Sequence, residues 1–252
     1  KPNSNNPLLP SFAQTSASSQ QSVLTGTDFP WAKERLRVLS ASSPGAAISE
    51  YRIGIDGFQK SLTDAQKYGL ALAYNANNLG SNAEPLLTEL AKKYPNNLWI
   101  ALAHAEAAGT AKKSILAQSR YEQLLQQFPN NRAVIIAFAQ FLIEQNNPTL
   151  AARAQNLMRP LINDSYEDVV FQRSYARACE LSGNTLRASE AYAEVAFLNG
   201  RVDDAINQLT MLLENDDLDY YQRTRIEARI AAFRPISLEL RRQGIRPEQQ
   251  GG

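Results

Sequence analysis

The pattern of apolar and polar residues repeats at a regular interval along the middle of the chain. Tyr94 and Phe128 each stand directly before the motif Pro-Asn-Asn, and a further apolar residue stands four positions earlier, at Leu90 and Leu124. Proline cannot continue a helix, whereas asparagine is favourable just before a helix begins. The pattern therefore predicts helices that end at each Pro-Asn-Asn and start again after it.

Small residues follow the same interval. Ala83, Ala117 and Ala151 are evenly spaced, and the first two precede Pro95 and Pro129 by the same number of positions. Alanine lets two antiparallel helices approach closely while the apolar positions fill their interface. A period of about 34 residues with these features is the signature of tetratricopeptide repeats, although the Trp-Leu-Gly-Tyr series of the first helix is mostly missing. The sequence thus predicts an all-α fold, a right-handed superhelical solenoid of antiparallel helix pairs.

The predicted units follow one another from residue 61 to 243. The first three cover about 63–97, 98–131 and 132–165, with Pro148 in the turn of the third. A fourth begins after a short insertion, with Gly183 in its turn and Ala188 in the small position. Gly200 and Ala205 take the same roles only half a repeat later, so one helix is expected to serve two hairpins. A long helix over about 219–243 is expected to close the stack.

The ends of the chain differ from this middle. Residues 1–26 are rich in small polar side chains and are interpreted as a flexible linker or the remnant of an upstream domain. Residues 27–60 are predicted to be a short helical connector, with one helix starting at Pro30 and a second weakened by Gly54 and Gly57. Residues 244–252 are predicted to be a flexible tail.

Composition narrows the function classes. The chain has 26 basic and 25 acidic residues, so no strong field attracts nucleic acid. No apolar run reaches the length that a helix needs to cross a bilayer, so no membrane-spanning segment is expected. The single Cys179 excludes an internal disulfide. The start at Lys-Pro-Asn, without a methionine or a signal sequence, fits a piece of a longer protein.

Candidate catalytic chemistry is scarce. His104 is the only histidine, whereas a catalytic zinc site usually takes about three protein ligands. We expect His104 to be a packing or groove residue and Cys179 to be a small buried helix residue without a base to activate it. The sequence therefore predicts no catalytic residue, no metal site and no cofactor within this chain.

A groove remains as the candidate functional feature. The first helix of each repeat usually lines the concave face of such solenoids, and its expected positions are mostly apolar. They contain little lysine or asparagine, so they do not resemble a clamp for a C-terminal carboxylate. The predicted partner-binding residues are Trp99, Glu106, Gln140, Ile143, Arg173 and Arg177. The alternative is that Trp99 and Ile143, with Leu102 and Ile136, are simply core between repeats.

Both ends of the predicted solenoid resemble a known family. Tyr221-Gln222-Arg223, Arg225, Glu227 and Ala228-Arg229 are similar to the closing helix of the beta-barrel assembly-enhancing protease family. Thr27, Pro30, Glu34, Arg35 and Leu36 resemble the step where such proteins leave their catalytic domain, although Phe29 stands where the family usually has histidine. The resemblance covers roughly residues 27–240, which corresponds to the C-terminal tetratricopeptide region of that family.

The resemblance implies a parent protein with an N-terminal HExxH zinc metallopeptidase domain, in which the zinc would be held. Such proteins act in the bacterial periplasm, in quality control and assembly of outer-membrane proteins. The helical region would then recognise protein partners, either the assembly machinery or unfolded barrel proteins. No catalytic residue is carried over, because the HExxH motif is absent from this chain. The competing hypothesis is a stand-alone scaffold or adaptor without an enzymatic parent.

Overall fold

The computed structural model describes residues 28–56 and 61–244, and all regular structure in these ranges is helical. The all-α prediction is therefore confirmed for this part of the chain. The predicted linker 1–26 and residues 245–252 of the predicted tail lie outside the described residues, as do Thr27 and Gly57. The helices, in chain order, are α1 (Phe29–Ser40), α2 (Pro44–Asp56), α3 (Asp64–Ala76), α4 (Gly80–Lys93), α5 (Leu98–Thr110), α6 (Ser114–Gln127), α7 (Arg132–Glu144), α8 (Pro148–Met158), two short 3-10 helices η1 (Arg159–Leu161) and η2 (Asn163–Ser165), α9 (Val169–Leu181), α10 (Thr185–Leu198), α11 (Val202–Leu213) and α12 (Tyr220–Arg242).

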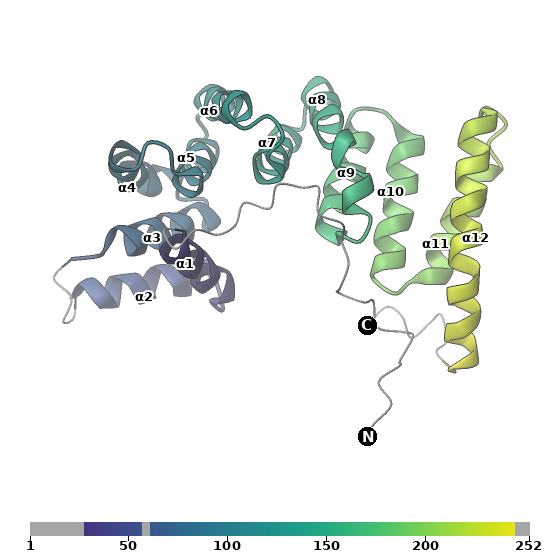
Figure 1. Cartoon of the computed structure of the whole chain (residues 1–252), viewed down its shortest axis with the longest axis horizontal. Coiled ribbons are helices and arrows are strands. Elements are labelled where there is room, and N and C mark those ends of the chain that lie inside the picture. Colours follow the sequence, from purple (N-terminus) through teal and green to yellow (C-terminus); the bar gives the residue numbers. More distant parts are fainter. Residues whose placement is uncertain (1–27, 57–60, 245–252) are drawn as a thin grey trace.

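Helices that follow one another in the chain pack together, so the molecule is a row of helix hairpins. Figure 1 shows this row bent into a curve, with α5 and α7 on its inner side and α4, α6 and α8 on its outer side. The first helices of successive hairpins also contact each other, from α3 to α5, from α5 to α7 and from α7 to α9. One continuous layer of helices therefore borders the hollow of the curve.

The turns from α3 to α4, α5 to α6, α7 to α8, α9 to α10 and α10 to α11 each contain a residue with a left-handed backbone. Asn78, Lys112 and Asn146 have φ values of 56°, 62° and 50°, and they follow one another at the interval found in the sequence. In the two later hairpins Gly183 and Gly200 occupy this position, with φ values of 82° and 80°. Glycine adopts this conformation at no steric cost and asparagine at a small one, whereas Lys112 has neither advantage. The repeat is thus present in the backbone itself.

The Pro-Asn-Asn motifs end one helix and cap the next, as predicted. Helix α4 ends at Lys93 and α6 at Gln127, just before the two motifs. The Asn97 side chain then accepts a hydrogen bond from the backbone N–H of Ile100 at the start of α5. Asn131 does the same for α7, where it accepts from two backbone N–H groups. These caps satisfy donors that a helix start leaves unpaired.

The predicted small residues lie where the two helices of a hairpin pack against each other. Ala83, Ala117, Ala151 and Ala205 are fully buried, which confirms the predicted spacing of small residues. A methyl group on Gly109 of α5 would lie 3.9 Å from Cβ of Ala117 on α6, so these two helices approach closely at this point. A larger side chain there has no space to occupy.

The predicted connector consists of two helices that pack on α3. The Trp31 ring meets Tyr68 and Tyr94 edge-on, with ring centroids 5.6 and 5.3 Å apart. The Tyr51 hydroxyl of α2 donates a 2.7 Å hydrogen bond to Glu34 of α1. These helices share one hydrophobic core with α3, α4 and α5. Helices α1 and α2 are therefore part of the packed row.

Two details of the predicted units are wrong. Pro148 is the first residue of α8, with Asn147 as its cap, because proline suits the first helical position. The sequence pattern also favours a start of the second helix of the first unit at Ala83, whereas α4 begins at Gly80. Two short 3-10 helices, η1 and η2, lie in the connection from α8 to α9, next to the predicted insertion. As expected, α10 packs against both α9 and α11 and so serves two hairpins.

The closing helix is α12. Ile226, Ile230 and Phe233 are buried on one side of it and pack with residues of α10 and α11, so α12 closes the stack as expected. Its N-terminus has a capping box, in which Asp219 accepts from the N–H of Gln222 and the Gln222 side chain accepts from the N–H of Asp219.

Candidate functional site

An open pocket of about 420 Å³ lies between α7 and α9. The pocket is lined by one face of each helix, since residues three and four positions apart in a helix lie on the same face. The lining residues are Gln140, Ile143, Glu144, Arg173, Ser174 and Arg177. Four of the six predicted partner-binding residues are therefore brought together in one place.

The two arginines of this pocket differ in their partners. Arg177 donates a 2.8 Å hydrogen bond to Glu180, one turn further along α9. Arg173 is exposed and makes no hydrogen bond or ion pair with any described residue. Val170, which precedes Arg173 by one turn of the helix, is 63% exposed. The α9 side of the pocket thus offers a guanidinium without a partner among the described residues, and an exposed apolar side chain lies one turn away, outside the pocket lining.

The α7 side is mixed in character. Ile143 is half-buried and packs against the central hydrophobic core, so part of it belongs to the core as the alternative interpretation held. Glu144 makes no ion pair within the described residues, and crowding by protein atoms raises the pKa of its carboxyl, with the Lys112 charge opposing. Gln140 completes this side with an amide that can donate and accept.

Glu106 lies on α5, outside the residues that line the pocket. The Asn75 amide donates to the Ala103 carbonyl oxygen at 2.9 Å and to Glu106 Oε2 at 3.4 Å. Solvent reaches the Glu106 side chain, yet protein atoms crowd it so closely that desolvation raises its pKa. The negative charge of Glu144 acts in the same direction, and the positive charge of Arg35 opposes it.

Trp99 is the predicted residue that fits a groove least. It lies in the first turn of α5, is half-buried, and packs against the hydrophobic cluster formed by α1 to α5. It does not line the pocket. Leu102 and Ile136 likewise pack against the central core. For these three residues the structure supports the packing interpretation.

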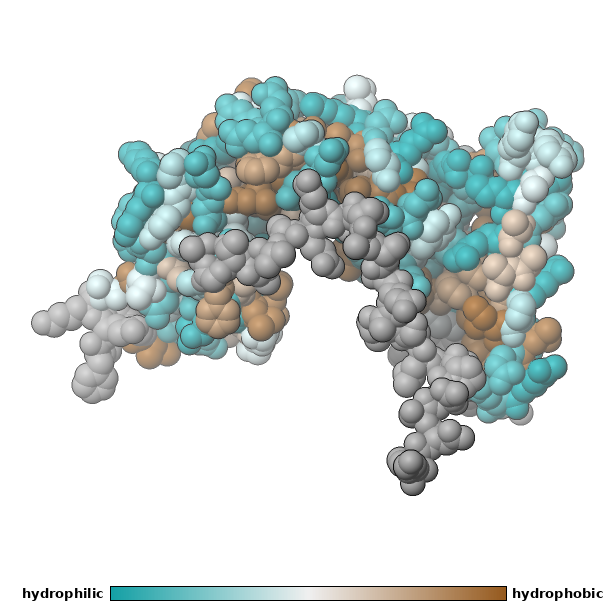
Figure 2. All heavy atoms as spheres, in the orientation of Figure 1, coloured by the Kyte–Doolittle hydropathy of each residue, from teal (hydrophilic) through white to brown (hydrophobic). Residues whose placement is uncertain are grey.

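Sequence reasoning missed Glu144 and Ser174 as lining residues. Each lies next to a residue that was predicted, Ile143 and Arg173 respectively. The register of the repeat marked the right helical face, but a helix face is broader than one line of positions. Figure 2 shows hydrophobic residues on the inner side of the curve and mostly hydrophilic residues along its outer edge.

His104 and Cys179 have packing roles. His104 Nε2 lies 3.2 Å from Glu84 Oε1 and 3.3 Å from Thr88 Oγ1, between α4 and α5. Cys179 is fully buried, and burial raises the pKa of its thiol to about 11, which disfavours a reactive thiolate. Within residues 28–56 and 61–244, no three histidine, cysteine, aspartate or glutamate side chains gather in a way that could hold a metal ion.

None of the helices in the described part of the chain combines the length and the apolar character needed to cross a membrane. This finding agrees with the expectation drawn from the hydrophobic pattern.

Neither a family model nor a curated protein matches this sequence.

Proposed function

We propose that this chain is a protein-binding tetratricopeptide solenoid whose inner face holds a segment of a partner protein. The observation that carries the proposal is the pocket between α7 and α9, where Arg173 is unpaired among the described residues and lies beside Ile143 and Gln140. Such a lining suits a peptide with apolar anchors and an acidic residue, because the anchors fill apolar surface and the acid pairs with the guanidinium.

The repeat architecture is supported by more than helix content. The left-handed turns recur at one regular interval, at Asn78, Lys112 and Asn146. Polar contacts between helices join residues at nearly the same sequence separation, as in Arg120 with Glu84 and Arg225 with Glu190. Contacts of this spacing are expected when equivalent positions of adjacent repeats face each other.

For the parent protein, we propose a periplasmic zinc metalloprotease of the beta-barrel assembly-enhancing type. The support is the resemblance at the closing helix, where Arg225 and Arg229 pair with Glu190 and Glu194 of α10. Arg225 and Arg229, which belong to the motif that resembles the family, therefore also stabilise the packing of α12 on α10. In this proposal the partners are outer-membrane assembly machinery or unfolded barrel proteins, and zinc belongs to a separate HExxH domain.

The competing proposal is a stand-alone scaffold without an enzymatic parent. The coding sequence upstream of Lys1 distinguishes the two, since an HExxH motif there supports the protease and its absence supports the scaffold. Both proposals use the same inner face.

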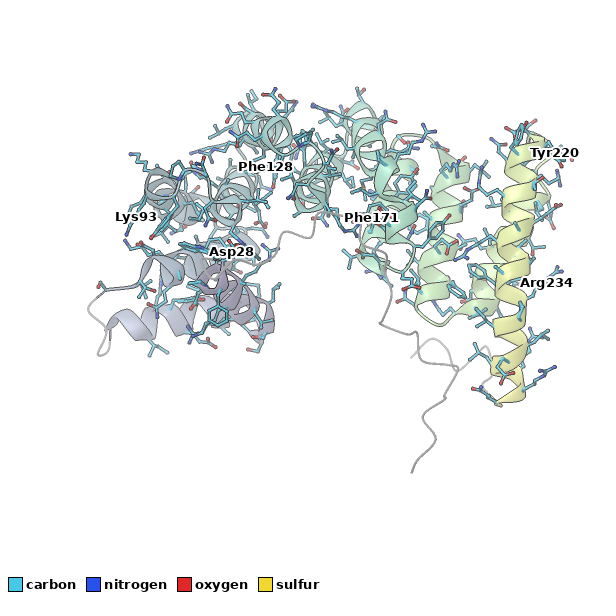
Figure 3. All side chains as sticks on the ribbon, viewed as in Figure 1. Asp28, Lys93, Phe128, Phe171, Tyr220 and Arg234 are labelled. Carbon is cyan, nitrogen blue, oxygen red and sulfur yellow. The ribbon has the colours of Figure 1, made fainter. Side chains whose placement is uncertain are left out.

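The binding proposal is tested by charge reversal at the pocket. Wild-type chain, Arg173→Glu/Arg177→Glu and Arg234→Glu are immobilised and exposed to purified outer-membrane assembly components and unfolded barrel proteins. Arg234 lies on α12, is exposed and has no partner among the described residues, which makes it a matched control (Figure 3). We expect capture by wild type and by Arg234→Glu, and reduced capture by the double variant at unchanged helical signal. Equal capture by all three chains would contradict the proposed surface.

A further inference from the structure

Most charges between the helices are paired, and the inner face is the exception. Glu84 pairs with Arg120 at 2.6 Å, Glu122 with Arg153 at 2.7 Å and Asp168 with Arg132 at 2.6 Å. By contrast, Glu106 on α5 and Glu144 on α7 make no ion pair with any described residue. Arg35 on α1 lies near enough to act on the charge of Glu106, but it forms no ion pair with it.

Unsatisfied polar atoms lie next to Glu106. Asn75 is 3% exposed and bonds Glu106 through its amide nitrogen, while its oxygen Oδ1 has no hydrogen-bond partner in the described part of the chain. Tyr68 is fully buried, and its hydroxyl makes no well-formed hydrogen bond there, although Arg35 lies close enough to act on it. Burial raises the pKa of Tyr68 to about 12, and the charge of Glu106 adds to this rise, so the two groups are electrostatically coupled.

Part of this arrangement costs stability. The Asn75 oxygen and the Tyr68 hydroxyl are buried without hydrogen bonds in the described part of the chain, which disfavours the folded state, while the exposed Glu106 and Glu144 carboxylates face no cation in an ion pair there. Desolvation holds the pKa of both Glu106 and Glu144 above the usual value, and the negative charge of Glu144 raises the pKa of Glu106 further. Both negative charges also raise the pKa of the buried Tyr121. Strained electrostatics of this kind concentrate at binding and catalytic sites, where a ligand supplies the missing partner.

We propose that Glu106 and Glu144 form an acceptor site for a lysine or arginine side chain of the bound protein segment. An ammonium or guanidinium group donates several hydrogen bonds and carries the charge that this part of the inner face lacks. The inference rests on the proposed function, because it assigns a second recognition element to the same bound segment.

The two charged elements fix the direction and the spacing of the segment. Glu144 borders the pocket of Arg173, and Glu106 lies one helix further along the row. Neighbouring helices pack about 8–10 Å apart, so a group held between α5 and α7 lies about 12–15 Å from α9. An extended chain advances about 3.3 Å per residue, so the basic and acidic residues of the partner should stand about four positions apart.

The experiment uses fluorescent peptides that carry one lysine and one aspartate among apolar residues, with the spacing varied from about two to ten positions. Binding to the whole chain is measured by anisotropy for wild type, Glu106→Gln/Glu144→Gln and Arg173→Gln. Each peptide has a matched version in which lysine is replaced by glutamine. We expect the tightest binding at a spacing of about four positions. We also expect the double glutamine variant to lose about tenfold in affinity for the lysine peptide, because its charge-assisted hydrogen bonds are lost, and almost nothing for the glutamine version.

The outcomes separate this inference from the proposed function. If Arg173→Gln weakens binding but the double glutamine variant binds both peptide versions like wild type, the acceptor site is wrong and the groove stands. If wild type binds no peptide of the series, the proposed groove is wrong and the acceptor site falls with it. Urea unfolding at pH 7.5 provides a second readout, in which Glu106→Gln should be more stable than wild type because it removes an uncompensated charge. A loss of stability would overturn the claim that Glu106 is unpaired at a cost.

Discussion

Arg229 of α12 donates two parallel hydrogen bonds to Glu194 of α10, from Nε to Oε1 at 2.5 Å and from Nη2 to Oε2 at 2.6 Å. The same guanidinium stacks over the Phe233 ring, with 4.3 Å between Cζ and the ring centroid. Glu194 is buried, and it would lose this ion pair if Arg229 were removed. This pair therefore holds the closing helix on the stack.

Replacing Arg229 by alanine should destabilise the chain. Breaking a buried ion pair costs roughly 3–5 kcal/mol, and because 32% of the Arg229 side chain is exposed we expect about 2–3 kcal/mol. Urea unfolding followed by circular dichroism measures the loss. Arg242→Ala is the control, since its pair with Glu239 is largely exposed and should contribute less than about 0.5 kcal/mol. Similar losses in both variants would contradict the account of α12.

Enlarging Ala117 should force α5 and α6 apart. It is fully buried against Gly109, and overpacking a tight core position costs about 1–3 kcal/mol. We expect Ala117→Leu to lower the melting temperature, whereas Ser119→Leu, at an exposed position of the same helix, should change it little. If the melting temperature of Ala117→Leu equals that of wild type, the small position has been assigned wrongly.

Lys112 offers a test of the repeated turn. Its φ of 62° costs a residue with a side chain about 1 kcal/mol or more, a cost that glycine avoids. We expect Lys112→Gly to stabilise the chain by about 0.5–1 kcal/mol, measured by urea unfolding. Lys112→Ala removes the same charge but keeps the strain, so it should bring no gain. Equal stability of the two variants would show that the charge and not the backbone matters here.

His104 should make stability depend on pH. Desolvation, followed by the charge of Arg120, lowers the pKa of His104, and Glu84 opposes this. The unfolded chain therefore binds a proton at a higher pH than the folded chain, so stability falls as pH drops below about 6.5. We expect wild type to lose more stability than His104→Gln between pH 7.5 and pH 5.5, measured as urea midpoints. Glu106 and Glu144 titrate in both chains and cancel in the comparison, so parallel pH profiles would contradict this role of His104.

Local sequence patterns predicted the helices well because their signals are short-range. Pro95 and Pro129 end helices, Asn97 and Asn131 cap them, and the buried alanines recur at fixed steps. Such features depend on a few neighbouring residues and survive without knowledge of the tertiary structure. The start of α4 at Gly80 was missed because its cap residue, Leu79, has no polar side chain that could accept a hydrogen bond from the helix start. The sequence therefore carries no capping signal at this position.

The candidate site was predictable only in outline. Helical register indicated which face borders the hollow, so Gln140, Ile143, Arg173 and Arg177 were found. Register shows which face a side chain occupies but not whether its charge is paired, since Arg177 pairs with Glu180 on its own helix and Arg225 pairs with Glu190 on another. Register alone therefore could not separate the paired Arg177 from Arg173, or Trp99 in the core from Glu106 in the hollow.

Site-specific photocross-linking tests most directly whether the inner face binds a protein segment. A photoreactive phenylalanine analogue is placed at position 143, in the pocket, and in a second chain at position 115, where Ile115 of α6 is 89% exposed. Each chain is irradiated with a purified, urea-unfolded outer-membrane barrel protein after dilution from urea. We predict cross-links from position 143 that decrease when Arg173→Glu is added, and few from position 115. Equal yields from the two positions, or yields at position 143 that do not respond to Arg173→Glu, would contradict binding at this face.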